Sequence, residues 1–324
     1  MVAQEPYRLG DAHKREDDTV TDSSVGQMDG SEVEIRDGRT SREAGVDPRL
    51  LREMARRIRV QLIRAVAHAQ GGHVGGPLSA AEILATLYFH EMRIRPDQPD
   101  WPERDRFVLS KGHCSIALYA TLALAGYFPV EELASFDAID SRLPGHPDMT
   151  GLPGVDMSTG SLGVGLSAAV GLALGARLHG HDGRVYALLG DGECHEGAIW
   201  EAAFIARRFE LDNLVAIVDA NGLAQFGPAA DVPGERRGPW EPGELEDRWR
   251  ACRWHVITAD GHDVLALAAA FDEAQATKGR PTVVIARTVK GKGVSFMENR
   301  WYWHSKVVTP DELALAMAEL GERA

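Results

Sequence analysis

Two short apolar runs joined by an amphipathic segment limit the possible folds more than any other feature of this sequence. Residues 185–189 and 214–219 are typical of buried strands, and residues 196–209 between them have helical spacing. Further strands are expected at residues 107–110, 255–257 and 282–286, and further helices at 48–70, 79–90, 115–125, 162–178, 264–278 and 310–321. Apolar strands that alternate with helices indicate a sheet covered on both faces. The prediction is therefore a three-layer α/β/α domain with a mostly parallel sheet.

The predicted domain does not include the whole chain. Residues 1–45 are polar and rich in acidic groups, with few side chains able to build a core, which predicts a flexible N-terminal tail. The folded domain is expected over residues 46–324, with Asp47 as a helix N-cap. The uncharged run at 160–176 is short for a membrane span and rich in Gly, Ala and Ser, so it is interpreted as a buried, closely packed helix that suits a dimer contact.

Charge and cysteine content narrow the function classes. The 324 residues carry a net charge of −13, which argues against binding nucleic acid or an anionic membrane surface through overall charge. The three cysteines, Cys114, Cys194 and Cys252, are far apart and show no CxxC spacing. We therefore expect neither disulfides nor a zinc ribbon, and a reducing cytoplasm as the location.

Oxygen-bearing side chains follow the two most apolar strands. Asp191 comes directly after the first strand, between Gly190 and Gly192, and Asn221 follows the second strand, thirty residues later. Ligands bind at the carboxyl ends of parallel strands, so both side chains should lie at one site. Mg²⁺, or Ca²⁺ or Mn²⁺ in its place, prefers such oxygens and takes others from phosphate and water. The sequence predicts a metal site formed by Asp191, Asn221 and the backbone carbonyl of Leu223.

This arrangement is similar to the thiamine-diphosphate signature, and other motifs extend the resemblance. Residues 70–77, 110–113 and 144–147 resemble the three histidine loops of transketolases, residues 159–163 the loop around the cofactor, and residues 290–293 and 303–304 the closing segment. The match runs from about residue 47 to 308 in the family's own order. The chain is identified as a member of the transketolase family, of the N-terminal subunit type, with thiamine diphosphate and Mg²⁺ as cofactors.

The resemblance also implies roles for individual residues. His73 and His146 should contact the reacting hydroxyls of the donor, while His113 and His304 should lie against the diphosphate and the substrate. Glu196 should sit at a subunit interface that links two cofactor sites. The remaining cofactor contacts implied are Gly160, Ser161, Leu162, Gly163, Gly190 and Gly192. Ser305 stands where the family usually has Gly after this Trp-His pair, so the backbone conformation near His304 is not implied by the resemblance. Zinc binding by His73 and His113 is disfavoured because their spacing does not match that of a helical zinc site.

The resemblance covers only part of an active transketolase. In this family a separate pyrimidine-binding domain supplies the glutamate that activates the cofactor, and no such domain follows here. It implies a C-terminal partner subunit in an α2β2 assembly and transfer of a two-carbon ketol unit between sugars or sugar phosphates. Two alternatives remain: delivery of the unit to a lipoyl or carrier-protein thiol, and a non-catalytic cofactor-binding subunit. Deoxyxylulose-phosphate synthase is disfavoured because that family lacks this histidine set.

Overall fold

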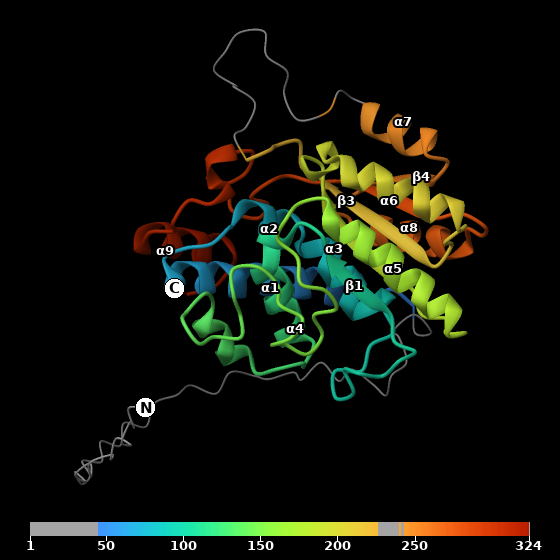
Figure 1. The fold of residues 1–324 in the computed structure, drawn as a ribbon. Coiled ribbons are helices and arrows are strands. Elements are labelled where there is room, and N and C mark those ends of the chain that lie inside the picture. Colours follow the sequence, from blue (N-terminus) through green and yellow to red (C-terminus); the bar gives the residue numbers. More distant parts are fainter. Residues whose placement is uncertain (1–44, 226–239, 241–242, 324) are drawn as a thin grey trace, which may run out of the picture. The chain divides into compact units, whose positions relative to one another are not determined.

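A five-stranded parallel sheet forms the centre of the computed structural model, which describes residues 45–225, 240 and 243–323 (Figure 1). The strand order is β1-β2-β3-β5-β4, and every neighbouring pair is parallel. The strands are β1 (Arg106–Leu109), β2 (Val185–Gly190), β3 (Leu214–Ala220), β4 (His255–Asp260) and β5 (Thr282–Arg287). The α/β prediction is confirmed. The predicted tail lies, apart from residue 45, outside the described residues.

Helices connect the strands and cover the sheet. The α-helices are α1 (Pro48–Ala69), α2 (Gly75–Ser79), α3 (Ala81–Thr86), α4 (Ser115–Leu124), α5 (Val164–Leu178), α6 (Gly197–Arg208), α7 (Glu244–Ala251), α8 (Val264–Ala276) and α9 (Pro310–Glu319). A π-helical turn spans Leu87–Glu91, and 3₁₀ turns span Gly112–Cys114, Val130–Ser135, Glu193–His195 and Trp301–His304. Two of these turns carry expected site residues: His113 lies within Gly112–Cys114, and His304 ends Trp301–His304.

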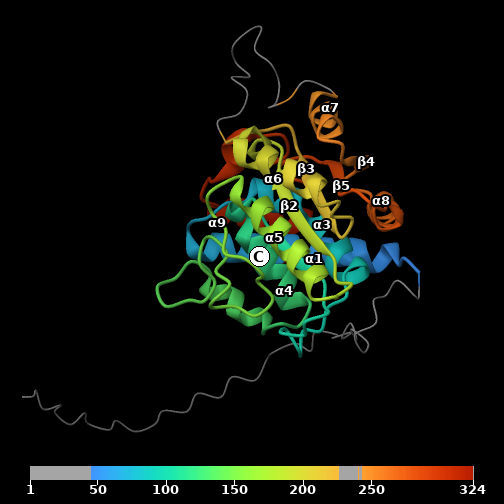
Figure 2. The ribbon, with the colours of Figure 1, turned by 45° about the vertical axis from the view of Figure 1, so that its right-hand side comes forward.

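The two faces of the sheet belong to two separate cores. Successive strand residues point to opposite sides, and in β1 the side chains of Phe107 and Leu109 pack with α1, α3, α4 and α8. Val108 joins the opposite core, which contains residues of α5, α6 and α7. Figure 2 shows α5 and α6 side by side on the strands. Both faces are buried, which explains why the strands read as continuous apolar runs.

Helix α1 shows how the sequence pattern produces the local structure. Asp47 accepts hydrogen bonds from the backbone N–H groups of Arg49 and Leu50, and Pro48 occupies the first helical position. The apolar side chains at helical spacing are all buried: Leu51, Met54, Ile58, Leu62, Ile63 and Val66. The predicted Asp47 cap and the buried face of this helix are confirmed.

Three expectations about helices need correction. The helix predicted from residue 79 begins earlier, at Gly75, breaks at Ala80 and ends in the π-helical turn. Helix α7 was not expected, although Leu245 and Trp249 are buried four residues apart. Helix α5 begins at Val164 and is only half buried in this chain, so its prediction as a buried helix is wrong for the outer face. Within the described ranges no helix is long and apolar enough to cross a membrane.

A buried ionic cluster joins α1, α3 and the loop after β4. Arg59 donates to both oxygens of Glu82, at 2.6 and 2.5 Å, and His262 Nδ1 lies 2.9 Å from Glu82 Oε2. The backbone N–H of Val289 donates to His262 Nε2 at 2.8 Å, so the ring hydrogen is on Nδ1 and points to Glu82. Burial opposes ionisation of Glu82, but the His262 hydrogen bond and the Arg59 charge outweigh it and lower its pKa to about 2.

This cluster gives a stability prediction with a defined pH range. Because the pKa of Glu82 is depressed in the folded state, ionised Glu82 adds to the free energy of unfolding at pH values above its unfolded pKa. This contribution is lost as pH falls from about 4.5 towards 2. Glu82→Gln should lower the free energy of unfolding at pH 7 by about 3 kcal/mol. Urea unfolding of both proteins at pH 7 and pH 4 would measure this. If the difference in free energy of unfolding between wild type and Glu82→Gln were as large at pH 4 as at pH 7, the depressed pKa of Glu82 would be contradicted.

Candidate active site

One cavity of about 270 Å³ opens at the carboxyl ends of β2 and β3. It lies where a parallel α/β sheet is expected to bind its ligand. Most of the predicted site residues line it: His73, His113, His146, Gly160, Leu162, Gly190, Asp191, Gly192, Asn221, Leu223 and His304. Loops far apart in the sequence therefore meet at one place.

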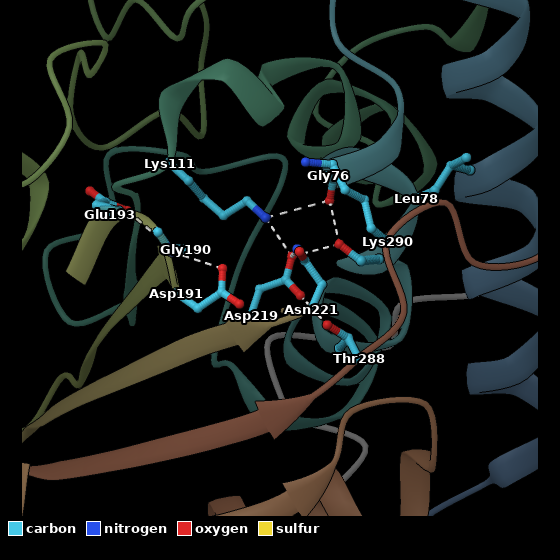
Figure 3. A network of polar contacts seen from close by, with 12 residues as sticks. Gly76, Leu78, Lys111, Gly190, Asp191, Glu193, Asp219, Asn221, Thr288 and Lys290 are labelled. Atoms are coloured by element: carbon cyan, nitrogen blue, oxygen red, sulfur yellow. Dashed lines mark hydrogen bonds and ion pairs between the residues drawn. The ribbon is translucent and has the colours of Figure 1, made fainter. Parts of the chain in front are cut away.

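The three expected metal ligands lie at the floor of this cavity. Asp191 is buried and its carboxylate accepts N–H bonds from Gly192, at 2.8 Å, and Gly222, at 2.6 Å. Asn221 Oδ1 accepts from the Leu223 N–H at 3.1 Å. The register pairs Gly190 with Asp219, so the ends of β2 and β3 place Asp191 and Asn221 side by side (Figure 3).

A fully buried ion pair supports the metal ligands from below. Lys111 donates to Asp219, which also accepts from Ser79 and Thr288. The Asn221 amide nitrogen lies 3.4 Å from the same carboxylate, and Figure 3 shows the two side chains next to each other. Asp219 therefore directs the amide nitrogen of Asn221 towards itself and leaves the amide oxygen available as a ligand. Sequence reasoning missed this role, although Asp219 is the one charged residue in an otherwise apolar strand.

Four histidines gather at the mouth of the cavity. The ring centre of His73 lies 5.1 Å from that of His113, 5.1 Å from that of His304 and 6.3 Å from that of His146, and His113 lies 5.0 Å from His304. They come from four different segments: the loop after α1, the 3₁₀ turn after β1, the loop before α5 and the turn before α9. At these separations the rings contact one another, so the four imidazoles form one cluster beside the cavity.

Neighbouring elements hold the loops that carry these histidines. Ser115 and Tyr119 of α4 donate to the carbonyls of Gly145 and Pro144, at 2.8 and 2.9 Å, and so hold the His146 loop. The Val74 N–H donates to the His304 carbonyl at 3.4 Å and joins the first and last histidine segments. The fixed backbone means that the four rings are positioned by the fold before any ligand binds.

Lys290 is a cation in the same cavity that the motif comparison left without a role. Its Nζ donates to His304 Nδ1 at 2.9 Å and to the Leu223 carbonyl at 3.3 Å, and its side chain is buried. Burial and then the charge of Lys111 lower the pKa of Lys290 to about 8. Because Lys290 donates to Nδ1, the neutral His304 ring carries its hydrogen on Nε2.

Burial also sets the ionisation of the other site residues. Burial and then Lys290 lower the pKa of His304 to about 3, and burial and then Lys111 hold the pKa of His113 well below its usual range. Burial and then His146 lower the pKa of His73. Burial, followed by the charge of Asp219, raises the pKa of Asp191 to about 6. The site thus combines neutral imidazoles with the carboxylate of Asp191, which a bound cation would stabilise.

Three predicted residues do not line the cavity. Ser161 faces a neighbouring hollow of about 220 Å³ that shares Gly160 with the cavity. Gly163 precedes α5 with φ of +88°, a conformation that favours glycine, and a Cβ there would meet Glu196 at 2.7 Å. Glu196 itself is exposed at the start of α6. Conversely, the cavity contains residues that were not predicted: Gly76, Glu193, Ala224, Gln225 and Lys290.

The donor set of the cavity fits a magnesium diphosphate. Asp191, Asn221 and the Leu223 carbonyl offer only hard oxygen ligands, and their few protein contacts leave lone pairs free for a cation. Within the described ranges, no group of three or more His, Cys, Asp or Glu side chains could hold a metal ion. A cation at Asp191 would therefore need further oxygens from the diphosphate, and Lys290 adds positive charge for that anion.

Comparison with known proteins gives the family. Residues 51–323 match the family described as "Transketolase, thiamine diphosphate binding domain". The chain is 44% identical over 270 residues to the 6-deoxy-6-sulfo-D-fructose transketolase subunit SqwG of Clostridium sp. (strain MSTE9), covering 83% of this chain and 96% of that protein. It is 40% identical over 265 residues to an apulose-4-phosphate transketolase subunit of Phocaeicola vulgatus, covering 82% and 92%.

Solved structures agree with this match. The fold is similar to that of Pichia stipitis transketolase in complex with sedoheptulose 7-phosphate, with a TM-score of 0.77 and 32% identity. The alignment covers 85% of this chain but 41% of that one, so the chain spans about two fifths of the solved transketolase. The chain belongs to the transketolase family and corresponds to its thiamine-diphosphate-binding half.

Proposed function

We propose that this chain is the cofactor-binding subunit of a two-component transketolase. It transfers a two-carbon ketol unit from a ketose or ketose phosphate to an aldose or related acceptor. The observation that carries the proposal is that Asp191, Asn221 and Leu223 line the same cavity as four clustered histidines. A cofactor-binding subunit without catalysis would need the floor of this cavity and not the histidine cluster above it.

The floor of the cavity holds the cofactor's diphosphate. Asp191, Asn221 and the Leu223 carbonyl bind Mg²⁺, or Ca²⁺ or Mn²⁺, together with diphosphate oxygens and water. Gly160, Leu162 and Gly192 contact the cofactor from the loops around it. Bound thiamine diphosphate supplies the carbon nucleophile and the electron sink for cleavage of the carbon–carbon bond.

The histidines act on the sugar. His73 and His146 contact the reacting hydroxyls of the donor, and His73 accepts or returns a proton there. His113 would lie against the diphosphate and the substrate, and His304 would face the diphosphate and help with proton transfer on the substrate. The low pKa values of His73, His113 and His304 support this assignment, because a neutral imidazole can donate one hydrogen bond and accept another at neutral pH.

A second polypeptide completes the site. Both relatives that cover almost the same length are named as subunits, and the solved transketolase is more than twice as long. The partner is a C-terminal, pyrimidine-binding subunit, in an α2β2 assembly in which Glu196 lies at a subunit contact. Residues 46–324 form the cofactor domain. Three buried free cysteines support a reducing, cytoplasmic location.

Reconstitution with the partner subunit tests the proposal. With thiamine diphosphate and Mg²⁺, the complex should convert a ketose phosphate and an aldose phosphate into the exchanged sugar pair, while each chain alone stays inactive. Products would be measured by mass spectrometry, with a lipoylated protein as a competing acceptor. Faster transfer to the lipoyl group would place the chain in a different acceptor class. Absence of transfer to any acceptor, despite cofactor binding, would indicate a non-catalytic subunit.

A further inference from the structure

Three loops that border the cofactor cavity meet at a single buried side chain, Glu193. Its Oε1 accepts hydrogen bonds from the Ser110 hydroxyl at 2.5 Å and from the Gly163 N–H at 2.9 Å, and its Oε2 accepts from the Gly190 N–H at 3.0 Å. Glu193 is 3% exposed and lines the cavity. The three donors belong to the loop after β1, the loop before α5 and the last residue of β2.

Close backbone packing shows independently that two of these loops are fitted to each other. A Cβ at Gly165 would lie 2.6 Å from Ser110 Cα, and one at Gly112 would lie 2.9 Å from the carbonyl of Thr159. Thr159 also donates to the Leu109 carbonyl at 2.6 Å. The loops carrying His113 and Gly160 therefore touch, and Glu193 joins both to the turn that carries Asp191.

The chemistry of this junction requires a carboxylate. All three partners are donors, and an ionised Glu is acceptor-only, whereas Gln would present an NH₂ group to at least one N–H or O–H. A negative charge beside a site for diphosphate is unfavourable unless hydrogen-bond donors of the protein satisfy both carboxylate oxygens. Here three donors satisfy its two oxygens.

We infer that Glu193 is a positioning residue for the cofactor: it fixes the loops of His113, Gly160 and Asp191 in the arrangement that binds thiamine diphosphate. The inference rests on the proposed function. In it, Glu193 acts by holding the loops through its hydrogen bonds. Glu193 does not itself need to contact the cofactor. Loss of the junction should therefore weaken cofactor binding more than it changes turnover once the cofactor is bound.

The test compares Glu193→Gln with a matched buried carboxylate at the amino end of β1. Asp105 is 3% exposed and accepts backbone N–H bonds from Arg93 and Arg184, both at 2.8 Å. In the complex with the partner subunit, calorimetry with thiamine diphosphate at saturating Mg²⁺ should show a Kd raised about 10- to 100-fold for Glu193→Gln. The kcat at saturating cofactor should fall by less than the Kd rises. Asp105→Asn should lower the Tm and leave the Kd unchanged.

A second variant keeps the inference testable if Glu193→Gln fails to fold. Ser110→Ala removes one of the three donors and retains the carboxylate, and should raise the Kd up to about tenfold. A Kd within twofold of the wild type in whichever variant folds overturns the inference and leaves the proposed function intact. An equal rise in Asp105→Asn also overturns it, because the effect would then be general. A wild-type complex that binds no thiamine diphosphate overturns the proposed function and this inference together.

Discussion

Asp191→Ala is expected to abolish Mg²⁺-dependent binding of thiamine diphosphate while the chain stays folded. The carboxylate is the one charged ligand of the proposed metal set, and its neighbours Asn221 and Leu223 offer only neutral oxygens. Loss of a direct ligand should raise the cofactor Kd by more than about 100-fold, the upper range for residues that act only through a ligand. The fold should persist because burial and Asp219 already disfavour the charge that is removed.

Calorimetric titration of the complex over a series of Mg²⁺ concentrations would measure this effect, with circular dichroism to confirm folding. Asp182→Ala is a suitable control, since Asp182 is exposed near the amino ends of the strands and pairs with Arg93. Cofactor binding that still depends on Mg²⁺ with an unchanged Kd in Asp191→Ala would show that the metal assignment is incorrect.

His73→Ala should lower kcat by about 10²- to 10⁴-fold with little change in cofactor affinity. His73 lies at the centre of the histidine cluster, within 5.1 Å of two other rings, and its pKa is lowered by burial and then by His146. It can therefore accept a proton from a donor hydroxyl near neutral pH. Steady-state kinetics at saturating thiamine diphosphate, together with the cofactor Kd, would separate the two roles.

Two further variants make the His73 result interpretable. His179→Ala should have no effect, because that ring is exposed at the end of α5. His73→Asn retains hydrogen bonding without proton transfer, so it should remain as impaired as His73→Ala if proton transfer is the main role. A loss of cofactor affinity with normal kcat in His73→Ala would instead place this ring against the diphosphate.

The fold was predictable where one physical constraint dominates. Strands buried on both faces need continuous apolar runs, and those runs identified β1, β2, β3 and β5 nearly in full. Helix α7 was not predicted because it has eight residues and is strongly charged, with only one short buried face. The start of helix α2 at Gly75 was not predicted because glycine and Pro77 are typical of a turn. In the structure, Trp303 and Lys290 pack closely against Gly75, and this packing favours a compact helical path.

The site was predictable to the extent that its residues occur in recognisable loops. The histidines and Asp191 lie in glycine-flanked motifs, and the structure brings all but Ser161, Gly163 and Glu196 of the expected residues to one cavity. Glu193, Lys290 and Asp219 are also in or beside these motifs, but their partners come from other segments. Glu193 joins Ser110, eighty-three residues earlier, and such contacts depend on tertiary packing that sequence spacing does not contain.

The pairing of Gly190 with Asp219 in neighbouring strands has a consequence for how this protein can change over evolutionary time. Slipping one strand by a single residue would turn its side chains to the opposite face, so the placement of the proposed ligands Asp191 and Asn221 depends on this register and tolerates almost no insertion within either strand. Loops such as residues 137–158, by contrast, contribute one histidine and much exposed backbone. Under the proposed function, a change of loop length could therefore alter the substrate without moving the strand ends that carry Asp191 and Asn221.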